Sequence, residues 1–185
     1  MRRFDELILL IGQYFLNKNI AYAIRGGVAV LFQGRFRTTE DIDIIINPEN
    51  FEIQDFIDFC QKNTLTVDPY DLKEGLIDRS QITIMDFPNS IRVDMRYAFT
   101  KWDKGAIKRA EIFSYKNQKI SVISPEYLII NKIYKSGRID LEDAYSVYFQ
   151  NESRINFDLM EQLAELLKVK KEYNAFIKKV LEIKD

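Results

Sequence analysis

The sequence predicts an α+β fold, in which a mixed, twisted β-sheet is flanked by helices and further helices follow at the C-terminal end. Two observations support this prediction. Short segments in which apolar and polar residues alternate are typical of strands with one covered face. Apolar residues at helical spacing frame these segments and fill residues 156–184. We therefore expect a core over residues 1–123 and a helical region over residues 124–185 that packs on it.

Three helices and two strands are predicted in the first 62 residues. Apolar residues at helical spacing predict a helix over residues 4–18. Glycine, asparagine and proline then separate a strand at 21–24, a helix at 28–33, a strand at 41–46 and a helix from Asn47–Pro48 to about residue 62.

Two hairpins and four helices are predicted beyond residue 62. The hairpins join residues 81–87 to 90–97 and residues 111–115 to 119–122. The helices cover residues 125–136, residues 141–149 and two segments within 156–184. The acidic stretch 68–78 is expected to be irregular, and the basic stretch 101–109 is expected to form a loop.

The residue types exclude several kinds of chemistry. The chain has no histidine and a single cysteine, Cys60, so disulfides, thiolate zinc sites and histidine-based catalysis are ruled out within one chain. A formal net charge of −1 is not typical of a protein that binds nucleic acid over a broad surface. Because the sequence has no long apolar run and no signal-peptide pattern, we expect a cytoplasmic protein without a membrane partner.

Two aspartates on one predicted strand suggest a metal site. Side chains alternate along a strand, so Asp41 and Asp43 share a face while Ile42 and Ile44 share the other. Two neighbouring carboxylates repel each other, and a hard divalent ion such as Mg²⁺ removes the conflict. Asp41 and Asp43 are therefore candidate metal ligands.

A glycine pair supplies the second half of the pattern. Gly26 and Gly27 lack Cβ atoms, so the backbone can approach a ligand closely. The N–H groups at the start of the following helix can then face phosphate oxygens. Glycines for phosphate and an Asp-x-Asp motif for metal together indicate nucleotide chemistry.

The spacing of these two motifs resembles a known signature. Gly26-Gly27, thirteen intervening residues and Asp41-Ile42-Asp43 are similar to the motif of the polymerase-beta-like nucleotidyltransferases. Gly-Gly-Val-Ala-Val followed by Arg37-Thr-Thr-Glu-Asp-Ile-Asp most resembles the minimal nucleotidyltransferases of abortive-infection (AbiEii-like) and toxin–antitoxin systems. The resemblance covers roughly residues 20–147, and it implies that residues 1–123 are a nucleotidyltransferase core. Arg25 departs from the family pattern, which has an apolar residue before the glycines.

A third carboxylate is implied by the same resemblance. Asp94, in Ile-Arg-Val-Asp-Met-Arg, matches the family's aspartate on a later strand. Asp41, Asp43 and Asp94 would then be catalytic and would hold two Mg²⁺ ions, with an NTP as substrate. Without the resemblance, Asp94 between Arg92 and Arg96 would be assigned to an exposed ladder of ion pairs.

The loop before the metal strand contains further candidates. Arg37 and the hydroxyls of Thr38 and Thr39 could bind the triphosphate or orient Asp41. The alternative is a polar, solvated loop, which we expect for Arg35.

Lys132 is the remaining catalytic candidate. The resemblance implies that Lys132 reaches the triphosphate. It also implies that Lys132 is positioned by Arg138, Asp140 and Asp143, which follow it in the chain. Buried ion pairs between two helices would explain Asp140 and Asp143 equally well.

The basic stretch 101–109 admits two interpretations. Trp102 could stack on a base while Lys104, Lys108 or Arg109 bind phosphates. Equally, Trp102 could only anchor the segment to the core.

These observations predict a Mg²⁺-dependent transfer of a nucleoside monophosphate from an NTP to an acceptor hydroxyl. The resemblance implies that the acceptor is a tRNA 3′ end or a protein, that the protein belongs to a toxin–antitoxin or phage-defence system, and that a cognate antitoxin or toxin is a partner. A catalytically silent nucleotidyltransferase fold that binds a partner is the alternative.

Overall fold

A seven-stranded mixed sheet forms the centre of the protein, whose structure is a computed structural model that describes residues 3–184. The strands are β1 (Tyr22–Arg25), β2 (Asp41–Ile46), β3 (Thr66–Val67), β4 (Ile82–Asp86), β5 (Ile91–Tyr97), β6 (Glu111–Tyr115) and β7 (Gln118–Val122). Their order across the sheet is β3-β4-β5-β2-β1-β7-β6. Strand β2 runs parallel to β5 and β1 parallel to β7, whereas the other neighbours are antiparallel.

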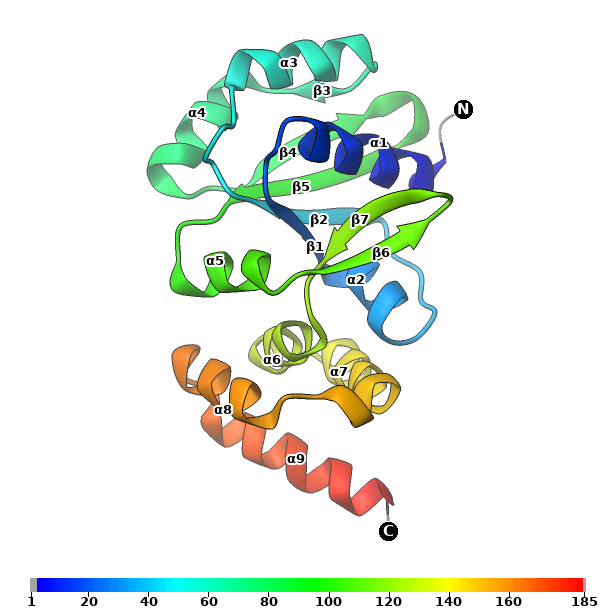
Figure 1. The fold of residues 1–185 in the computed structure, drawn as a ribbon, viewed down its shortest axis with the longest axis vertical. Coiled ribbons are helices and arrows are strands. Elements are labelled where there is room, and N and C mark those ends of the chain that lie inside the picture. Colours follow the sequence, from blue (N-terminus) through cyan, green and yellow to red (C-terminus); the bar gives the residue numbers. More distant parts are fainter. Residues whose placement is uncertain (1–2, 185) are drawn as a thin grey trace.

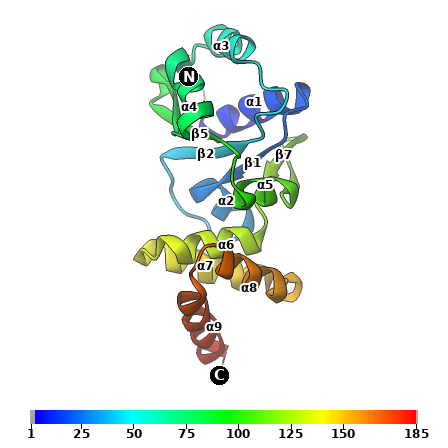
Figure 2. The same ribbon diagram turned by 90° about the vertical axis from the view of Figure 1, so that its left-hand side faces the viewer.

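Helices cover both faces of this sheet, as Figures 1 and 2 show. One face carries α1 (Phe4–Asn17), α3 (Ile53–Lys62) and α4 (Pro69–Asp78), and the opposite face carries α2 (Gly26–Gln33) and α5 (Lys101–Lys108). Beyond α2 and α5 lie α6 (Pro125–Lys135), α7 (Arg138–Asn151), α8 (Phe157–Leu166) and α9 (Lys170–Lys184). Short 3₁₀ turns occur at Phe87–Asn89 and Glu152–Arg154. The predicted α+β class, a mixed sheet flanked by helices, is confirmed.

Strand β2 lies in the middle of the sheet because its apolar side chains can be buried completely. Ile42, Ile44 and Ile46 are at most 1% exposed, whereas Asp41 and Asp43 keep partial contact with solvent. The predicted alternation is therefore present. It places both acids of the strand on one face of the sheet.

Two predictions between residues 47 and 78 are wrong. Asn47–Pro48 does not begin a helix: the Asn47 side chain accepts a hydrogen bond from the Glu49 N–H at 3.3 Å in a turn, and α3 begins at Ile53. Residues 69–78 are helical rather than irregular, because Asp68 caps the helix through a 2.8 Å hydrogen bond from the Tyr70 N–H and Pro69 occupies the first helical position.

The basic stretch after β5 is also a helix rather than a loop. Thr100 and Asp103 form a capping box at its start, in which the Thr100 hydroxyl accepts from the Asp103 N–H at 3.0 Å. Both predicted hairpins are confirmed, and α6 begins at Pro125 as predicted. Helix α7 begins three residues earlier than predicted, at Arg138. Among the described residues, none of the helices has both the length and the apolar character to span a bilayer.

Candidate active site

Three acidic side chains meet where β2 and β5 run side by side. In the parallel register Asp43 lies opposite Asp94, and Asp41 lies opposite Arg92. Residues opposite each other on neighbouring strands share a face, with the strands about 4.8 Å apart. The structure therefore brings the predicted Asp41, Asp43 and Asp94 together on one face of the sheet.

The glycine pair packs directly against these acids. Gly26 has a φ of +65°, a conformation that favours glycine, and a Cβ atom there would lie 1.8 Å from Oδ2 of Asp43. A Cβ atom on Gly27 would lie 2.4 Å from Oγ1 of Thr39. Both glycines are thus needed for close packing around Asp43 and Thr39. They also place the first N–H groups of α2 beside the acids, where an anion could bind.

Hydroxyl groups orient two of the three carboxylates. The Thr39 hydroxyl lies 3.3 Å from Oδ1 of Asp41, and the Thr83 hydroxyl lies 3.3 Å from Oδ1 of Asp94. Thr83 is the cross-strand neighbour of Asp94 in the β4–β5 hairpin. Sequence reasoning missed Thr83, although the hairpin register around Pro88–Asn89 could have placed it there.

Arg92 forms ion pairs with two of the acids, Asp41 and Asp94. Its Nη2 atom lies 2.9 Å from Oδ2 of Asp41 and 3.1 Å from Oδ2 of Asp94. Hydrogen bonding to Asp41 and the charge of Asp94 raise the pKa of the Arg92 guanidinium. Only part of the exposed ladder of ion pairs, which was the alternative for this strand, is present: Arg92 pairs with Asp94, but Asp94 is buried and Arg96 pairs with Asp103 instead.

Asp94 is the most buried of the three carboxylates, and this changes the pKa of its carboxyl group. The residue is 6% exposed, and burial raises the pKa of its carboxyl above the ordinary value. Arg92 and the hydrogen bond from Thr83 oppose this shift, and the charges of Asp43 and Asp41 add to it. The resulting pKa is raised, so this carboxylate accepts a proton more readily than an exposed one.

The donor atoms of the cluster fit a hard divalent cation. Carboxylate oxygens from adjacent strands are the ligands that Mg²⁺ prefers, and the Arg92 guanidinium already lies between two of them as a cation does. As their side chains stand, no three His, Cys, Asp or Glu residues in the part of the chain that the structure describes form a group that could hold a metal ion. Binding would therefore require Asp41 and Asp94 to turn away from Arg92.

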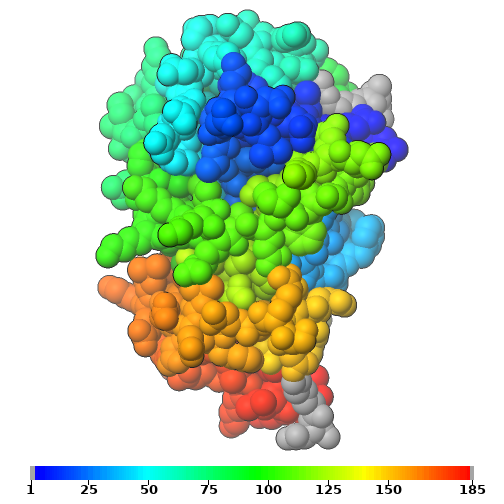
Figure 3. Space-filling model, in the orientation of Figure 1, coloured from blue at the N-terminus to red at the C-terminus, as the bar shows by residue number. Residues whose placement is uncertain are grey.

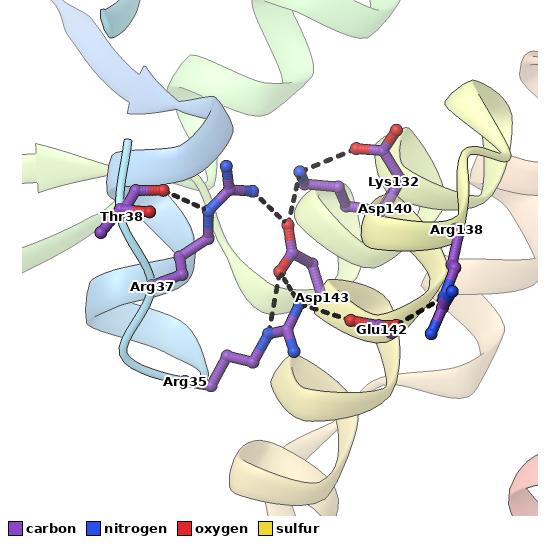
Figure 4. A network of polar contacts seen from close by, with 8 residues as sticks. All are labelled: Arg35, Arg37, Thr38, Lys132, Arg138, Asp140, Glu142 and Asp143. Carbon is purple, nitrogen blue, oxygen red and sulfur yellow. Dashed lines mark hydrogen bonds and ion pairs between the residues drawn. The ribbon is translucent and has the colours of Figure 1, made fainter. Parts of the chain in front are cut away.

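A second polar cluster, shown in Figure 4, centres on Asp143 of α7. This carboxylate is fully buried, and Oδ2 lies 2.9 Å from Nζ of Lys132 and 2.7 Å from Nη1 of Arg37. Oδ1 accepts a hydrogen bond from Nε of Arg35 at 3.1 Å, and Lys132 also pairs with Asp140 at 2.9 Å. Asp143 thus joins the loop before β2 to helices α6 and α7.

The charges of this cluster are balanced inside the protein. Burial alone would raise the pKa of the Asp143 carboxyl, but Lys132 and Arg37 outweigh it and hold that pKa below its ordinary value. The prediction for Arg35 is wrong: it pairs with Asp143 and, at 3.1 Å, with Glu142 instead of pointing into solvent. The ion pairs proposed as the alternative for Asp140 and Asp143 are present.

The two clusters lie on either side of the start of α2. The Arg37 guanidinium carbon would be 3.6 Å from a Cβ atom on Gly27, so Arg37 reaches from Asp143 to the glycine pair. Arg37 also donates from Nε to the backbone carbonyl of Thr38 at 3.0 Å. The structure thus places the Arg37 guanidinium beside the first N–H groups of α2, an arrangement in which an anion could bind.

Trp102 lies in the core rather than on an open surface. It is 7% exposed, and its ring centre lies 4.9 Å from that of Tyr127. The structure therefore favours the anchoring interpretation of this residue. Trp102 also contributes to the wall of a cavity that Arg25 and Arg96 line.

Comparison with known proteins identifies the fold. No protein-family model matches the sequence, and no curated protein matches it significantly. A solved nucleotidyltransferase-like antigen from Paracoccidioides brasiliensis is similar to 93% of this chain and 90% of its own, with 18% identity and a TM-score of 0.52. The lincomycin-bound lincosamide adenylyltransferase LnuA is similar over 78% of this chain and 96% of its own, with 18% identity and a TM-score of 0.52.

A third solved structure extends this result. ANT(2")-Ia, in its complex with adenylyl-2"-tobramycin, is similar over 89% of this chain and 96% of its own, with 13% identity and a TM-score of 0.55. By name, the first is a nucleotidyltransferase-like protein and the second an adenylyltransferase, and the third is in complex with an adenylylated compound. The chain therefore has a nucleotidyltransferase fold.

Proposed function

We propose that this protein is a Mg²⁺-dependent nucleotidyltransferase that transfers a nucleoside monophosphate from an NTP to an acceptor hydroxyl. One observation supports this most strongly: Asp43 lies opposite Asp94 on parallel strands, and the positive-φ turn at Gly26 packs against Asp43. The fold of the antibiotic adenylyltransferases supports nucleotidyl transfer in general.

Asp41, Asp43 and Asp94 would hold the metal ions. Bound there, Mg²⁺ supplies charge neutralisation for the triphosphate and lowers the pKa of the attacking hydroxyl. Thr39 keeps the Asp41 carboxylate facing the site.

The glycine pair and the second cluster would bind the leaving pyrophosphate. In the transfer, the acceptor oxygen bonds to the α-phosphorus while the bond to the bridging oxygen breaks. Negative charge then grows on the pyrophosphate, and the N–H groups of Gly26 and Gly27 together with Arg37 and Lys132 would neutralise it. Arg37 and Lys132 both pair with Asp143, so their charges are held close together. Thr38 would contribute through its backbone contact with Arg37.

Within this function the acceptor is a tRNA 3′ end or a protein hydroxyl, and the cellular role is that of a toxin–antitoxin or phage-defence component acting with a cognate antitoxin or toxin. These finer assignments come from the motif resemblance to the abortive-infection and toxin–antitoxin nucleotidyltransferases. Two of the solved neighbours, the lincosamide antibiotic adenylyltransferase LnuA and ANT(2")-Ia with adenylyl-2"-tobramycin, have small-molecule antibiotics in their names, so a small-molecule acceptor is part of the test.

The experiment incubates the purified protein with Mg²⁺, each labelled NTP in turn, and total tRNA, a proteome extract or tobramycin. Label should appear on RNA or protein with the wild type and with Asp58→Asn, an exposed control on α3, and should vanish with Asp41→Ala. Absence of label from every acceptor, together with absence of Mg²⁺-dependent NTP binding by calorimetry, would refute the proposal and favour a catalytically silent partner-binding module.

A further inference from the structure

A cavity of about 540 Å³ lies between strands β1 and β5 and helices α5, α6 and α8. Each of these five elements contributes side chains to its wall. Figure 3 shows the surfaces of α5 and α8 next to each other on one face of the molecule. A cavity of this size is large enough to enclose a small organic molecule.

The charged side chains of the cavity are mostly cations. Four basic residues and one acidic residue contribute to the wall: Arg25, Arg96, Lys101, Lys135 and Asp103. The acidic residue is already engaged, since Asp103 is 3% exposed and pairs with Arg96 and with the Thr100 hydroxyl. Within residues 3–184, the side chains of Arg25, Lys101 and Lys135 form no ion pair. The cavity therefore holds positive charge that a bound anion would neutralise.

Two arginines in this wall lie close together. Arg25 is near enough to Arg96 for the like charges of the two guanidinium groups to repel each other. The Nε atom of Arg96 is buried and has no hydrogen-bond partner among the described residues. An anion between the two guanidinium groups would relieve the repulsion and accept a hydrogen bond from this nitrogen.

A phosphate group suits these donors better than a carboxylate does. A phosphomonoester has a charge of about −1.5 to −2 at neutral pH and three terminal oxygens, whereas a carboxylate has a single charge and two oxygens. Three terminal oxygens can accept hydrogen bonds from Arg25, from Arg96 and from one of the two lysines at the same time. The set of cations therefore favours a phosphate.

The rest of the wall suits an apolar or aromatic group. Its large side chains are those of Trp102, Tyr134, Leu166 and Leu167. Tyr134 is 58% exposed, so much of this residue can still contact a ligand. Aromatic rings pack favourably on one another. A ligand that joins a ring to a phosphate would contact both kinds of wall.

We propose that this cavity is a binding site for a small phosphomonoester with an apolar or aromatic body, whose phosphate binds Arg25 and Arg96 and whose body packs on Tyr134. Binding there requires neither a metal ion nor an NTP. Arg25 is the cross-strand neighbour of Asp43, so the ligand would lie next to the candidate active site. The inference goes beyond the proposed function and does not depend on it.

Calorimetry on the whole chain, without metal or nucleotide, tests the site. The probes are phenyl phosphate, inorganic phosphate and phenol. Phenyl phosphate should bind most tightly, and inorganic phosphate should bind about three- to tenfold more weakly because it lacks the ring. Phenol, which lacks the phosphate, should show no measurable binding. Absence of phenyl phosphate binding, or binding of phenol as tight as that of phenyl phosphate, would overturn the inference.

Two variants test the two parts of the site separately. Arg25→Gln should weaken the binding of both phosphates by about tenfold. Tyr134→Ser should weaken phenyl phosphate by about threefold or more and leave inorganic phosphate unchanged. Lys73→Gln and Tyr70→Ser, which change exposed residues of α4, are the controls and should alter neither affinity. Equal phosphate affinity in Arg25→Gln and the controls would contradict the assignment.

Competition shows whether the cavity belongs instead to the proposed transfer reaction. Phenyl phosphate should stay bound when Mg²⁺ and a saturating NTP are added, and also when a single-stranded RNA with a free 3′ hydroxyl is added. Displacement by the NTP would make the cavity part of the nucleotide site, and displacement by the RNA would make it part of the acceptor site. Either result would overturn the inference and leave the proposed function standing.

Discussion

A Cβ atom on Gly26 would lie 1.8 Å from Oδ2 of Asp43, so the backbone at Gly26 packs against the Asp43 carboxylate and leaves no room for a side chain. This relationship connects the two sequence motifs. The glycine matters for the shape of the acidic cluster as well as for any phosphate that binds beside it.

Gly26→Ala should therefore damage both stability and the site. The left-handed backbone alone costs about 1–2 kcal/mol of unfolding free energy, and the displaced Asp43 should weaken Mg²⁺-dependent NTP binding. Chemical denaturation and calorimetry measure the two effects. Gly137→Ala is the control, since that glycine is exposed, has a φ of −68°, and would meet only the end of the Asp140 side chain. Equal stability of the two variants would contradict this assignment.

Arg92→Ala should release Asp41 and Asp94 for a metal ion. Arg92 is half-exposed, so its pairs stabilise the protein by at most about 1 kcal/mol. Without its competition, Mg²⁺ affinity in the absence of nucleotide should rise by up to about fivefold. Titration with Mg²⁺ by calorimetry checks this, and a weaker affinity in the variant would show that Arg92 supports metal binding instead.

Thr83→Val should remove a hydrogen bond that holds the Asp94 carboxylate. Because Asp94 is buried, loss of the 3.3 Å hydrogen bond should lower the free energy of unfolding by about 1 kcal/mol. Chemical denaturation measures this loss, and Thr83→Ser should restore the wild-type value. An unchanged free energy of unfolding in Thr83→Val would show that the hydroxyl has no effect on Asp94.

Asp143→Ala should destabilise the protein by about 3–5 kcal/mol, because it leaves the buried ammonium of Lys132 without this partner and also removes contacts to Arg37 and Arg35. Denaturant titration measures the loss. Asp158→Ala, an exposed acid in the first turn of α8, should change stability by less than about 1 kcal/mol. A loss of less than about 1 kcal/mol in Asp143→Ala would contradict a structural role for the buried pairs.

The same residue predicts the acid sensitivity of the fold. The pKa of Asp143 is lower in the folded protein than its ordinary value of 3.8, so its contribution is complete above that value and is lost as the pH falls through the folded pKa. Unfolding free energies of wild type and Asp143→Asn should therefore converge as the pH falls below about 3.8. A difference that stays constant down to the acid transition would contradict this linkage.

The sequence predicted the strands better than the segments between them. Alternation in Asp41–Ile46 and Ile91–Tyr97 was strong enough to place both strands and the shared face of their acids. The predicted start of α3 at Asn47 was wrong because the Asn47 side chain accepts a hydrogen bond from the Glu49 N–H in a turn. The same sequence pattern is typical of turns and of helix N-caps. Helix α4 was missed because its apolar content is low and only its cap at Asp68 predicts it.

The site required tertiary information that no local pattern contains. The register of the sheet brings Thr83 and Arg92 to their partners. Arg35 pairs with Glu142 and Asp143, which are 107 or more residues away along the chain. Arg25 was recognised as a departure from the family pattern, but its position in the wall of one cavity with Arg96 depends on tertiary packing. The division of the chain at residue 123 and the closer resemblance to the AbiEii-like nucleotidyltransferases stay predictions.

The role of Asp43 in a metal-dependent nucleotidyl-transfer site is tested by the rate of Mg²⁺-dependent label transfer from NTP in Asp43→Asn. This rate should fall by several orders of magnitude with an unchanged denaturation curve, while Asp58→Asn keeps the wild-type rate. Full activity in folded Asp43→Asn would contradict the mechanism.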